Sequence, residues 1–423
     1  MNAADKEFLA GLFQEAVRAA DPKEALRPYI PTRPKGRTIV IGAGKGAAQL
    51  ARAFEELWGE PIEGVVVTRY GYGEECKHIR VLEAAHPVPD KAGLEATQEL
   101  FRTVSGLGED DLVVALVCGG GSALLAAPPD GFELEDEQAL NQALLASGAP
   151  IGVMNAIRKH FSAVKGGRLA EAAFPAKVVS LVVSDVPGDD PAQVASGPTV
   201  PCQVSRLDAL NMIRSRRISL PVKIMGHIET EAATAPSLDD PAFARNEVHV
   251  IASAAKSLNA AARLAEEQGI KAVILSDAIE GEAKDVGLVH AALARQIASE
   301  DQPFKAPVLL LSGGETTVTL SGEFGRGGRN TAFLLSFLNA IEGTERVFAL
   351  SADTDGIDGS EDNAGAFADG NSAAAMRAAG IDPVEALGAN DAWGAFNAVN
   401  DLFVPGPTGT NVNDFRAIWI KAS

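Results

Sequence analysis

The sequence has few cysteines, and their positions exclude two common kinds of stabilising site. Only three occur in 423 residues, at Cys76, Cys118 and Cys202. They form no CxxC pair and no zinc-ligand spacing, so neither a disulfide framework nor a structural zinc is expected. Such an odd and sparse set is typical of a protein from a reducing compartment.

The sequence also lacks an excess of basic residues and lacks long apolar runs. It has 37 Lys and Arg against 56 Asp and Glu, which gives a net charge of −19. This charge argues against nucleic acid or an anionic membrane as a partner, although local basic residues can still bind an anionic small molecule. No apolar run reaches the roughly 20 residues that span a bilayer. The N-terminal segment is an acidic amphipathic pattern without the basic region of a signal peptide, so we expect a cytoplasmic protein.

What the sequence does have is a set of apolar segments that each end in Gly, Ser or Asp. Continuous β-branched runs of this kind are typical of parallel strands buried on both faces. Open α/β sheets bind ligands outside the carboxyl ends of their strands, so the pattern predicts a site for a charged small molecule, with phosphate as the leading candidate. The five segments are residues 38–47, 112–124, 178–190, 307–318 and 346–359.

The chain is too long for one ordinary core, so two domains are expected. Predicted strands alternate with predicted helices, which indicates a doubly wound α/β sheet. We expect helices at residues 3–20 and 151–174, among others. An irregular stretch containing Pro221 and Pro236 suggests the boundary, which gives domains 1–240 and 241–423. The second domain is then expected to begin with a strand at 248–252.

The first strand ends in GAGKGA, which places Lys45 at the start of a predicted helix. The glycine spacing matches the dinucleotide-binding fingerprint. The next strand, however, ends at Arg69 instead of the carboxylate that the ribose of NAD requires. Arg69 suits NADP, so the possibility of an NADP-dependent reductase stays open. A tight turn that binds no ligand is a further alternative. A lysine at a helix N-terminus opposes the helix dipole, and a bound phosphate or carboxylate would remove that cost.

Two further segments are candidates for binding anions. Gly119, Gly120, Gly121 and Ser122 follow a strand, and successive backbone N–H groups there can form an anion-binding nest. Arg158 and Lys165 belong to a basic patch in an otherwise acidic protein. The alternatives are a mobile loop for the glycines and a solvated helix face for the basic patch.

Acidic residues follow two other strands. Asp185 and Asp189 lie close to Ser196 in the sequence, and Asp355 lies in the run DTDGIDG. Carboxylates at strand ends can hold Mg²⁺ together with phosphate oxygens. The alternative is a series of capping residues and Asx-turns.

A last pair of glycine-rich segments contains Glu315 and Arg329. An arginine among glycines can bring its planar fork close to a ligand. A flexible hairpin tip is the alternative.

Taken together, these segments resemble one family, the glycerate 2-kinases with a C-terminal MOFRL domain. The resemblance runs from about residue 8 to residue 420. It rests on GAGKGA, VVVTRYG, AAHPVPD, CGGGSALL, NAIRKHFSAVKGGRLA, SDVPGDDPAQVASGP, SGGETTV, GRGGRN, SADTDGIDG and GPTGTNVND. Cys118 is a small departure, because a serine is common before the three glycines.

The resemblance implies a reaction of ATP with D-glycerate that gives 2-phosphoglycerate and needs a divalent cation such as Mg²⁺. It also implies a Rossmann-like N-terminal domain, a smaller α/β C-terminal domain and an active-site cleft between them. The family's proposed catalytic lysine and arginine fall on Lys45 and Arg329. Family members are often labelled hydroxypyruvate reductases. The absence of the protein carboxylate that would bind the ribose of NAD argues against this alternative.

On this basis we expect Lys45 and Arg329 to meet at the transferring phosphoryl group. The Gly119–Ser122 segment and Ser196 would hold an anionic group. Asp185 or Asp189 would bind Mg²⁺ or accept the proton of the 2-hydroxyl. Arg158 and Lys165 would bind the carboxylate of glycerate. Glu315 and Asp355 are weaker candidates, Asp355 as a metal ligand. The expected partners are glycerate and a nucleotide, with a homodimer left open.

Overall fold

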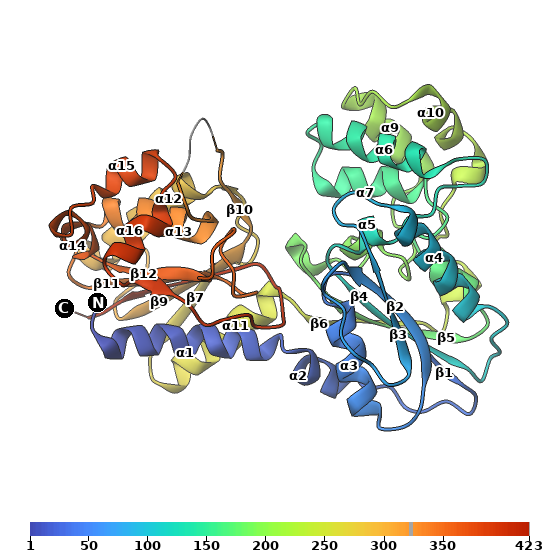
Figure 1. Cartoon of the computed structure of the whole chain (residues 1–423), viewed down its shortest axis with the longest axis horizontal. Helices are drawn as coiled ribbons and strands as arrows, with labels where there is room; N and C mark the ends of the chain where they lie inside the picture. The colour runs from blue at the N-terminus through green and yellow to red at the C-terminus, as the bar shows by residue number, and fades with distance from the viewer. Residues whose placement is uncertain (321–324, 423) are drawn as a thin grey trace. The chain divides into compact units, whose positions relative to one another are not determined.

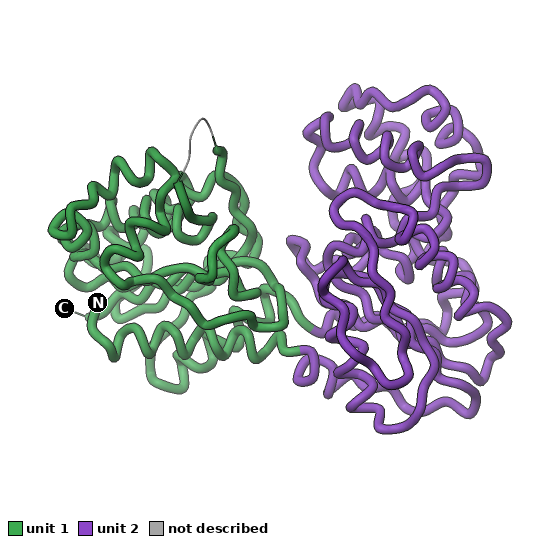
Figure 2. The backbone as a smooth tube through the Cα atoms, in the orientation of Figure 1, with its two compact units in different colours: residues 1–21, 252–423 green, residues 22–251 purple. Residues whose placement is uncertain are grey.

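The computed structural model describes residues 1–320 and 325–422, which fold into two compact units (Figures 1 and 2). Unit 1 consists of Met1–Asp21 and Ala252–Ser423, and unit 2 consists of Pro22–Ile251. The chain therefore begins in unit 1, builds all of unit 2, and then returns to complete unit 1. Each unit is an α/β structure, as the sequence predicts, and each is built around a six-stranded sheet.

The sheet of unit 2 places the carboxyl ends of five parallel strands at one edge. The five strands that come first in the chain all pair in parallel. Their apolar side chains form a core with the helices α4 (Lys91–Val104) and α8 (Arg168–Ala172). The helix α3 (Ala47–Trp58) contacts four of the same strands. The strand order is β3 (Ile79–Ala84), β2 (Glu63–Arg69), β1 (Thr38–Ala43), β4 (Leu112–Cys118), β5 (Lys177–Val183) and β6 (Glu247–Ala252).

Four helices of unit 2 form a separate cluster beyond the sheet, seen at the upper right of Figure 1. Buried side chains from each helix, among them Leu140, Ile157, Leu210 and Ile224, give this cluster its own apolar core. The helices are α6 (Leu134–Ala146), α7 (Ile151–Lys159), α9 (Arg206–Ser215) and α10 (Val222–Ile228). Two short helices, α2 (Pro22–Leu26) and α5 (Gly121–Leu124), complete the unit.

The sheet of unit 1 is mixed. β7 and β9 are parallel, and β14 lies antiparallel to both β9 and β11, so β7, β9 and β11 end at the same edge. β12 and β13 extend the sheet as antiparallel strands. The order is β13 (Leu402–Phe403), β12 (Gly365–Asp369), β11 (Val347–Asp353), β14 (Asp414–Ile420), β9 (Val308–Gly314) and β7 (Lys271–Ser276). β8 (Gly281–Glu282) and β10 (Thr316–Thr317) form a separate parallel pair.

Helices cover both faces of this sheet because its strands are apolar on both faces (Figure 1). Leu309 and Leu311 of β9 pack with α1 (Ala3–Ala19) and α11 (Ala254–Glu267). Val308 and Leu310 point to the other face and pack with α12 (Ala283–Glu300) and α13 (Arg329–Ala340). The remaining helices of unit 1 are α14 (Ser372–Ala378), α15 (Pro383–Gly388) and α16 (Ala392–Ala398).

The two units differ from the predicted domains 1–240 and 241–423 at both ends of unit 2. Strand β6, expected to open the second domain, extends the sheet of unit 2 beside β5. Helix α1 belongs to unit 1, where Phe13 packs edge-on against Phe403 and Phe415, and Lys421 pairs with Asp5. The partners of α1 lie hundreds of residues further along the chain, so no local pattern reveals them.

The single helix expected over residues 151–174 is two helices in the structure. Gly166 and Gly167 lie between α7 and α8 with φ values of 67° and 94°, which an α-helix cannot contain. Arg168 donates to the carbonyl oxygens of Lys159 and Lys165, at 2.7 and 3.0 Å, and so satisfies backbone acceptors at the break. Among the helices of the described residues, none is long and apolar enough to cross a bilayer.

Candidate functional site

Lys45 lies in the tight turn between β1 and α3, and its backbone is fixed by the neighbouring strands. Its N–H donates to the carbonyl of Gly119 at 2.8 Å, and its carbonyl accepts from Oγ1 of Thr68 at 3.0 Å. Gly44 precedes it with a φ of 139°, and a Cβ atom there would lie 2.3 Å from Sγ of Cys118. Only glycine fits at position 44, so the glycines of GAGKGA set the place of Lys45.

The glycine run after β4 allows three polar side chains to approach the backbone closely. A Cβ atom at Gly120 would lie 2.8 Å from Cγ of Lys45 and 3.2 Å from Nε2 of His86. A Cβ atom at Gly119 would lie 1.8 Å from Oδ2 of Asp185. The structure therefore brings Lys45, His86 and Asp185 together around these two glycines.

The charges near Gly120 favour an anionic ligand. Within the described residues, Nζ of Lys45 forms no hydrogen bond or ion pair, and Nε of Arg69 is buried without a hydrogen-bond partner. Burial, followed by the positive charges of Lys45 and Arg69, lowers the pKa of His86 to about 4. His86 is therefore a neutral imidazole at neutral pH, available to exchange hydrogen bonds with a ligand.

A chain of hydrogen bonds links the glycine run to Arg158. Oγ of Ser196 donates to Oδ1 of Asn155 at 3.1 Å, so the 2.7 Å contact between Ser122 and Ser196 has Ser122 as the donor. Nη1 of Arg158 donates to the same oxygen of Asn155 at 3.0 Å. The structure thus brings Ser122, Ser196 and Arg158 together through Asn155.

The backbone at Ser196 is strained. Ala195, Ser196 and Gly197 have φ values of 52°, 59° and 61° in succession. A non-glycine residue in this region costs about 1–3 kcal/mol. Gly121 passes so close that a Cβ atom there would lie 2.6 Å from Cβ of Ala195. Surrounding contacts hold this strained backbone at the position where Ser196 contacts Ser122. Backbone strain of this kind is common at functional sites.

Lys165 differs from the sequence-based expectation. Its side chain is buried and donates to Oε1 of Glu137 at 2.6 Å and to the carbonyl of Leu125 at 2.9 Å. A buried ammonium requires such a partner, because an unpaired charge in the interior is strongly unfavourable. The ion pair joins α6 to the segment after α7, so we assign Lys165 to the stability of unit 2 and not to ligand binding.

The acidic candidates of unit 2 lie in different environments. Asp185 lies against Gly119, whereas Asp189 lies in a 3-10 turn with a φ of 54° and no side-chain hydrogen bond in the described part of the chain. Over residues 1–320 and 325–422, no three His, Cys, Asp or Glu side chains are grouped so as to hold a metal ion. A cation that relies on protein carboxylates alone is therefore not favoured.

Cys118 is an inert thiol despite its position beside Lys45. The N–H of Gly46 donates to its Sγ at 3.3 Å, and burial raises its pKa to about 12. The thiolate, which is the reactive form, is thus absent at neutral pH.

In unit 1, Arg329 is the first residue of α13 and is held by three carboxylates. Its Nε donates to Asp414 at 2.7 Å, one Nη donates to Glu315 at 3.1 Å, and the other binds Asp353. Glu315 follows β9, Asp353 ends β11 and Asp414 begins β14, so three neighbouring strands position the guanidinium. Arg329 is therefore held by a network of carboxylates and is not at a flexible hairpin tip.

The network around Arg329 has more negative than positive groups. Burial alone would lower the pKa of Arg329, but Asp414 and Asp353 raise it above its ordinary value. Burial, only partly offset by Arg329, raises the pKa of Asp353 well above that of an ordinary carboxyl, and Asp355 and Asp414 add to this shift. Arg329 therefore stays charged at any physiological pH.

The DTDGIDG run has structural roles that the sequence left open. Asp358 accepts from the N–H groups of Asn330 and Thr331, at 2.9 and 2.8 Å, and so caps the N-terminus of α13. Asp355 accepts from the N–H of Ile357 at 2.9 Å and from Nδ2 of Asn411 at 3.4 Å. These contacts match the Asx-turn alternative.

The sequence reasoning missed several residues that the structure places at these sites. His86 occurs only within the quoted run AAHPVPD, without any local feature that assigns it a role. Asp353 and Asp414 lie 61 positions apart in the chain, but they are direct partners in the register of β11 and β14, where both contact Arg329. A carboxylate at the end of a predicted strand was a usable signal for Asp353, whereas no such signal exists for Asp414 or Asn155.

Comparisons with known proteins agree with the resemblance. Residues 8–229 match the family model described as a domain of unknown function, DUF4147, and residues 308–414 match the MOFRL family. A protein from Agrobacterium vitis, provisionally named a hydroxypyruvate reductase, is 48% identical over 98% of this chain and 94% of its own length. The D-glycerate 2-kinase of Thermotoga maritima is 39% identical over 97% of both chains.

A solved structure also matches along the whole chain. The crystal structure of glycerate kinase from Thermotoga maritima has a TM-score of 0.90 and 38% identity, and the match covers 99% of this chain and 100% of that chain. At this identity and coverage the shared order of motifs extends over both units. The chain therefore belongs to the family of glycerate 2-kinases, in which a DUF4147 region is followed by a MOFRL domain.

Proposed function

We propose that this chain transfers the γ-phosphoryl group of ATP to the 2-hydroxyl of D-glycerate and so forms 2-phosphoglycerate. Relatives named as glycerate 2-kinases match along nearly their full length, which supports this reaction. The observation that carries the proposal is the Lys45 ammonium, which lies beside a glycine run and forms no ion pair among the described residues. A phosphate group would supply such a partner.

The residues of unit 2 suit the electrostatic demands of phosphoryl transfer, in which positioning and charge neutralisation do most of the work. Lys45 would stabilise the charge that develops on the transferring group. The N–H groups of Gly120–Ser122 would hold an anionic oxygen. Arg158, through Asn155 and Ser196, would keep the hydroxyl of Ser122 in place, and it is our candidate for attracting the carboxylate of glycerate.

For Mg²⁺ we propose a single protein carboxylate. Mg²⁺ that accompanies a nucleotide keeps several waters and binds mainly to phosphate oxygens, with one or two carboxylates from the protein. Asp185 fits this role because its carboxylate lies against Gly119. Bound Mg²⁺ would neutralise phosphate charge.

The other two acidic candidates have different prospects. Asp189 remains our candidate for accepting the proton of the 2-hydroxyl. Asp355 is less suited to a metal, because both its oxygens accept other hydrogen bonds.

For Arg329 we propose a role in stabilising an anionic substrate group. A guanidinium shared among three carboxylates can exchange the exposed one, Glu315, for a ligand oxygen while Asp353 and Asp414 keep it in place. Glu315 would then be the partner that leaves Arg329 when the ligand binds.

The cytoplasmic location remains a prediction from the sequence.

A paired assay separates the kinase from the reductase. The purified protein is incubated with D-glycerate, ATP and Mg²⁺, and separately with hydroxypyruvate and NADPH. We expect ADP release that requires both glycerate and Mg²⁺, and no NADPH oxidation above background. Robust NADPH oxidation without glycerate-dependent ADP release would contradict the proposal.

A further inference from the structure

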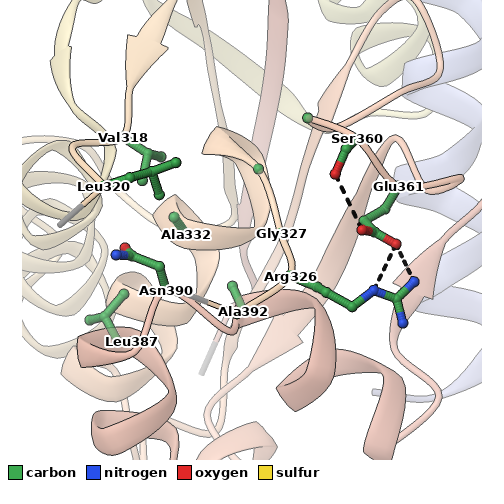
Figure 3. A pocket seen from close by; sticks show the side chains of 13 residues that line it. Val318, Leu320, Arg326, Gly327, Ala332, Ser360, Glu361, Leu387, Asn390 and Ala392 are labelled. Carbon is green, nitrogen blue, oxygen red and sulfur yellow. Dashed lines mark hydrogen bonds and ion pairs between the residues drawn. The ribbon is translucent and has the colours of Figure 1, made fainter. Parts of the chain in front are cut away.

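Unit 1 contains a cavity of about 300 Å³ that no proposed step uses (Figure 3). It lies between the start of α13, the segment that joins α15 to α16, and the loop of residues 325–328. Its volume is at the lower end of the range for small-molecule sites, about 300–1,000 Å³. Its wall is largely apolar and includes Val318, Leu320, Ala332, Leu387 and Ala392.

The cavity is preformed by close backbone contacts. The N–H of Gly325 donates to the carbonyl of Ala389 at 3.0 Å, and the N–H of Trp393 donates to the carbonyl of Arg326 at 2.9 Å. A Cβ atom at Gly325 would lie 2.4 Å from Cβ of Asp391, and one at Gly328 would lie 2.4 Å from Asp358. The glycines of GRGGRN thus let this loop lie flat against its neighbours and form one side of the cavity.

The charges around the cavity do not favour an anion. Among the described residues, Arg326 is the only basic one that lines it, and its guanidinium stacks on Trp393 at 3.5 Å from the ring centroid. Nε of the same arginine donates to Oε2 of Glu361 at 2.9 Å, as Figure 3 shows. The positive charge is already neutralised, and the N-terminus of α13 is capped by Asp358. A carboxylate or phosphate would gain little here, whereas a flat neutral ring would bury apolar surface.

One polar side chain in the cavity can fix the orientation of a ligand. The carboxamide of Asn390 lies between Leu320 and Leu387 in Figure 3 and has no hydrogen-bond partner within the part of the chain that the structure describes. It offers one donor and one acceptor. This pair is complementary to N7 and N6 of adenine, but not to N7 and O6 of guanine, which are both acceptors.

We propose that this cavity binds the adenine base of the nucleotide. The proposal rests on the proposed function, which requires a nucleotide site. The cavity is lined by Gly328, and the next residue is Arg329, so the base site and the arginine assigned to an anionic group share one loop. The glycine-rich loop thereby connects recognition of the base to the chemistry of the phosphates.

Two variants test the site by direct binding of ADP and GDP in titration calorimetry, which does not depend on turnover. Ala332→Leu places a larger side chain into the cavity from a helix that tolerates leucine. Asn390→Gly removes the carboxamide but suits the positive φ of 52°. Asn400→Gly is the matched control, because Asn400 has a φ of 56° and lies outside the cavity.

We expect Ala332→Leu to weaken ADP binding at least 10-fold, and Asn390→Gly to reduce the preference for ADP over GDP at least 5-fold. Asn400→Gly should bind as the unchanged protein does. Undiminished ADP binding by both cavity variants would overturn the proposal, as would an unchanged protein that binds no ADP. Weakened ADP binding in a protein without glycerate-dependent activity would support the base site and contradict the proposed function instead.

Discussion

Lys45 shows how one residue can be placed by its neighbours and yet be left without a partner. Two hydrogen bonds of its backbone and two glycines fix its position, but no acidic group of the described residues forms an ion pair with its ammonium. A lysine near the start of a helix opposes the helix dipole, and a bound anion would offset that cost.

The first prediction concerns this charge. Lys45→Met keeps the apolar stem and removes the ammonium, and we expect kcat to fall by about 10²-fold or more, as for the loss of one preorganised electrostatic contact. The melting temperature should stay level or rise slightly. Steady-state kinetics and thermal melting on the same preparation measure both. Lys91→Met, at the exposed start of α4, is the control, and near-normal kcat in Lys45→Met would make Lys45 a structural residue.

Arg329 calls for a different test because it is fully paired. Arg329→Lys keeps the charge, but an ammonium cannot reach three carboxylates from one position. We expect a fall of kcat/KM by at least 10-fold. Stability should also fall, by about 1–3 kcal/mol, because buried carboxylates lose a partner. Arg377→Lys alters an exposed ion pair and serves as the control. Full activity in Arg329→Lys would remove Arg329 from the reaction.

His86 gives a prediction about pH. Its pKa is lowered to about 4 in the folded protein, against about 6.5 in an unfolded chain. Between these values the unfolded chain binds a proton that the folded protein does not, so stability falls as pH falls from about 6.5 to 4. We expect His86→Gln to lose less stability than the unchanged protein over this window, measured by urea unfolding at each pH. Parallel pH profiles would show that His86 is not held neutral by its site.

At the scale of the element, loops at the ends of strands position most of the candidate residues. The long apolar strands and amphipathic helices could be predicted from the sequence, because their side-chain periodicity is strong. Strand β12 could not, because its residues GAFAD are small and not β-branched. The break between α7 and α8 differs from the helix expected over residues 151–174, because Gly166 and Gly167 adopt positive φ values that only the folded structure reveals.

A helix cap provides the prediction at this scale. Asp358 lies 27 residues beyond Thr331 in the chain, yet it caps α13. Asp358→Asn leaves one acceptor oxygen and adds an unpaired buried amide, so we expect a loss of about 1–2 kcal/mol in the free energy of unfolding. Asp382→Asn, at the exposed cap of α15, should cost less. Equal losses from the two variants would show that the remote cap has no special role.

At the scale of the whole molecule, the sequence could predict two α/β units but not how the chain is divided between them. The assignment of α1 to unit 1 depends on Phe13 meeting Phe403 and Phe415, which are long-range contacts without a local signal. The same limit applies to the candidate sites. Lys45 and Arg329 could be identified from the resemblance, whereas Asp353, Asp414 and Asn155 are defined only by contacts in the folded structure.

The central claim is that this molecule phosphorylates D-glycerate on its 2-hydroxyl. The most direct test is proton–phosphorus correlated NMR of the product formed from D-glycerate and MgATP by the unchanged protein, with Lys45→Met as the matched sample. We predict that the phosphorus couples to the single proton on C2, and that this signal accumulates about 10²-fold more slowly with the variant. Coupling to the two protons on C3, or no phosphorylated product at all, would contradict the account.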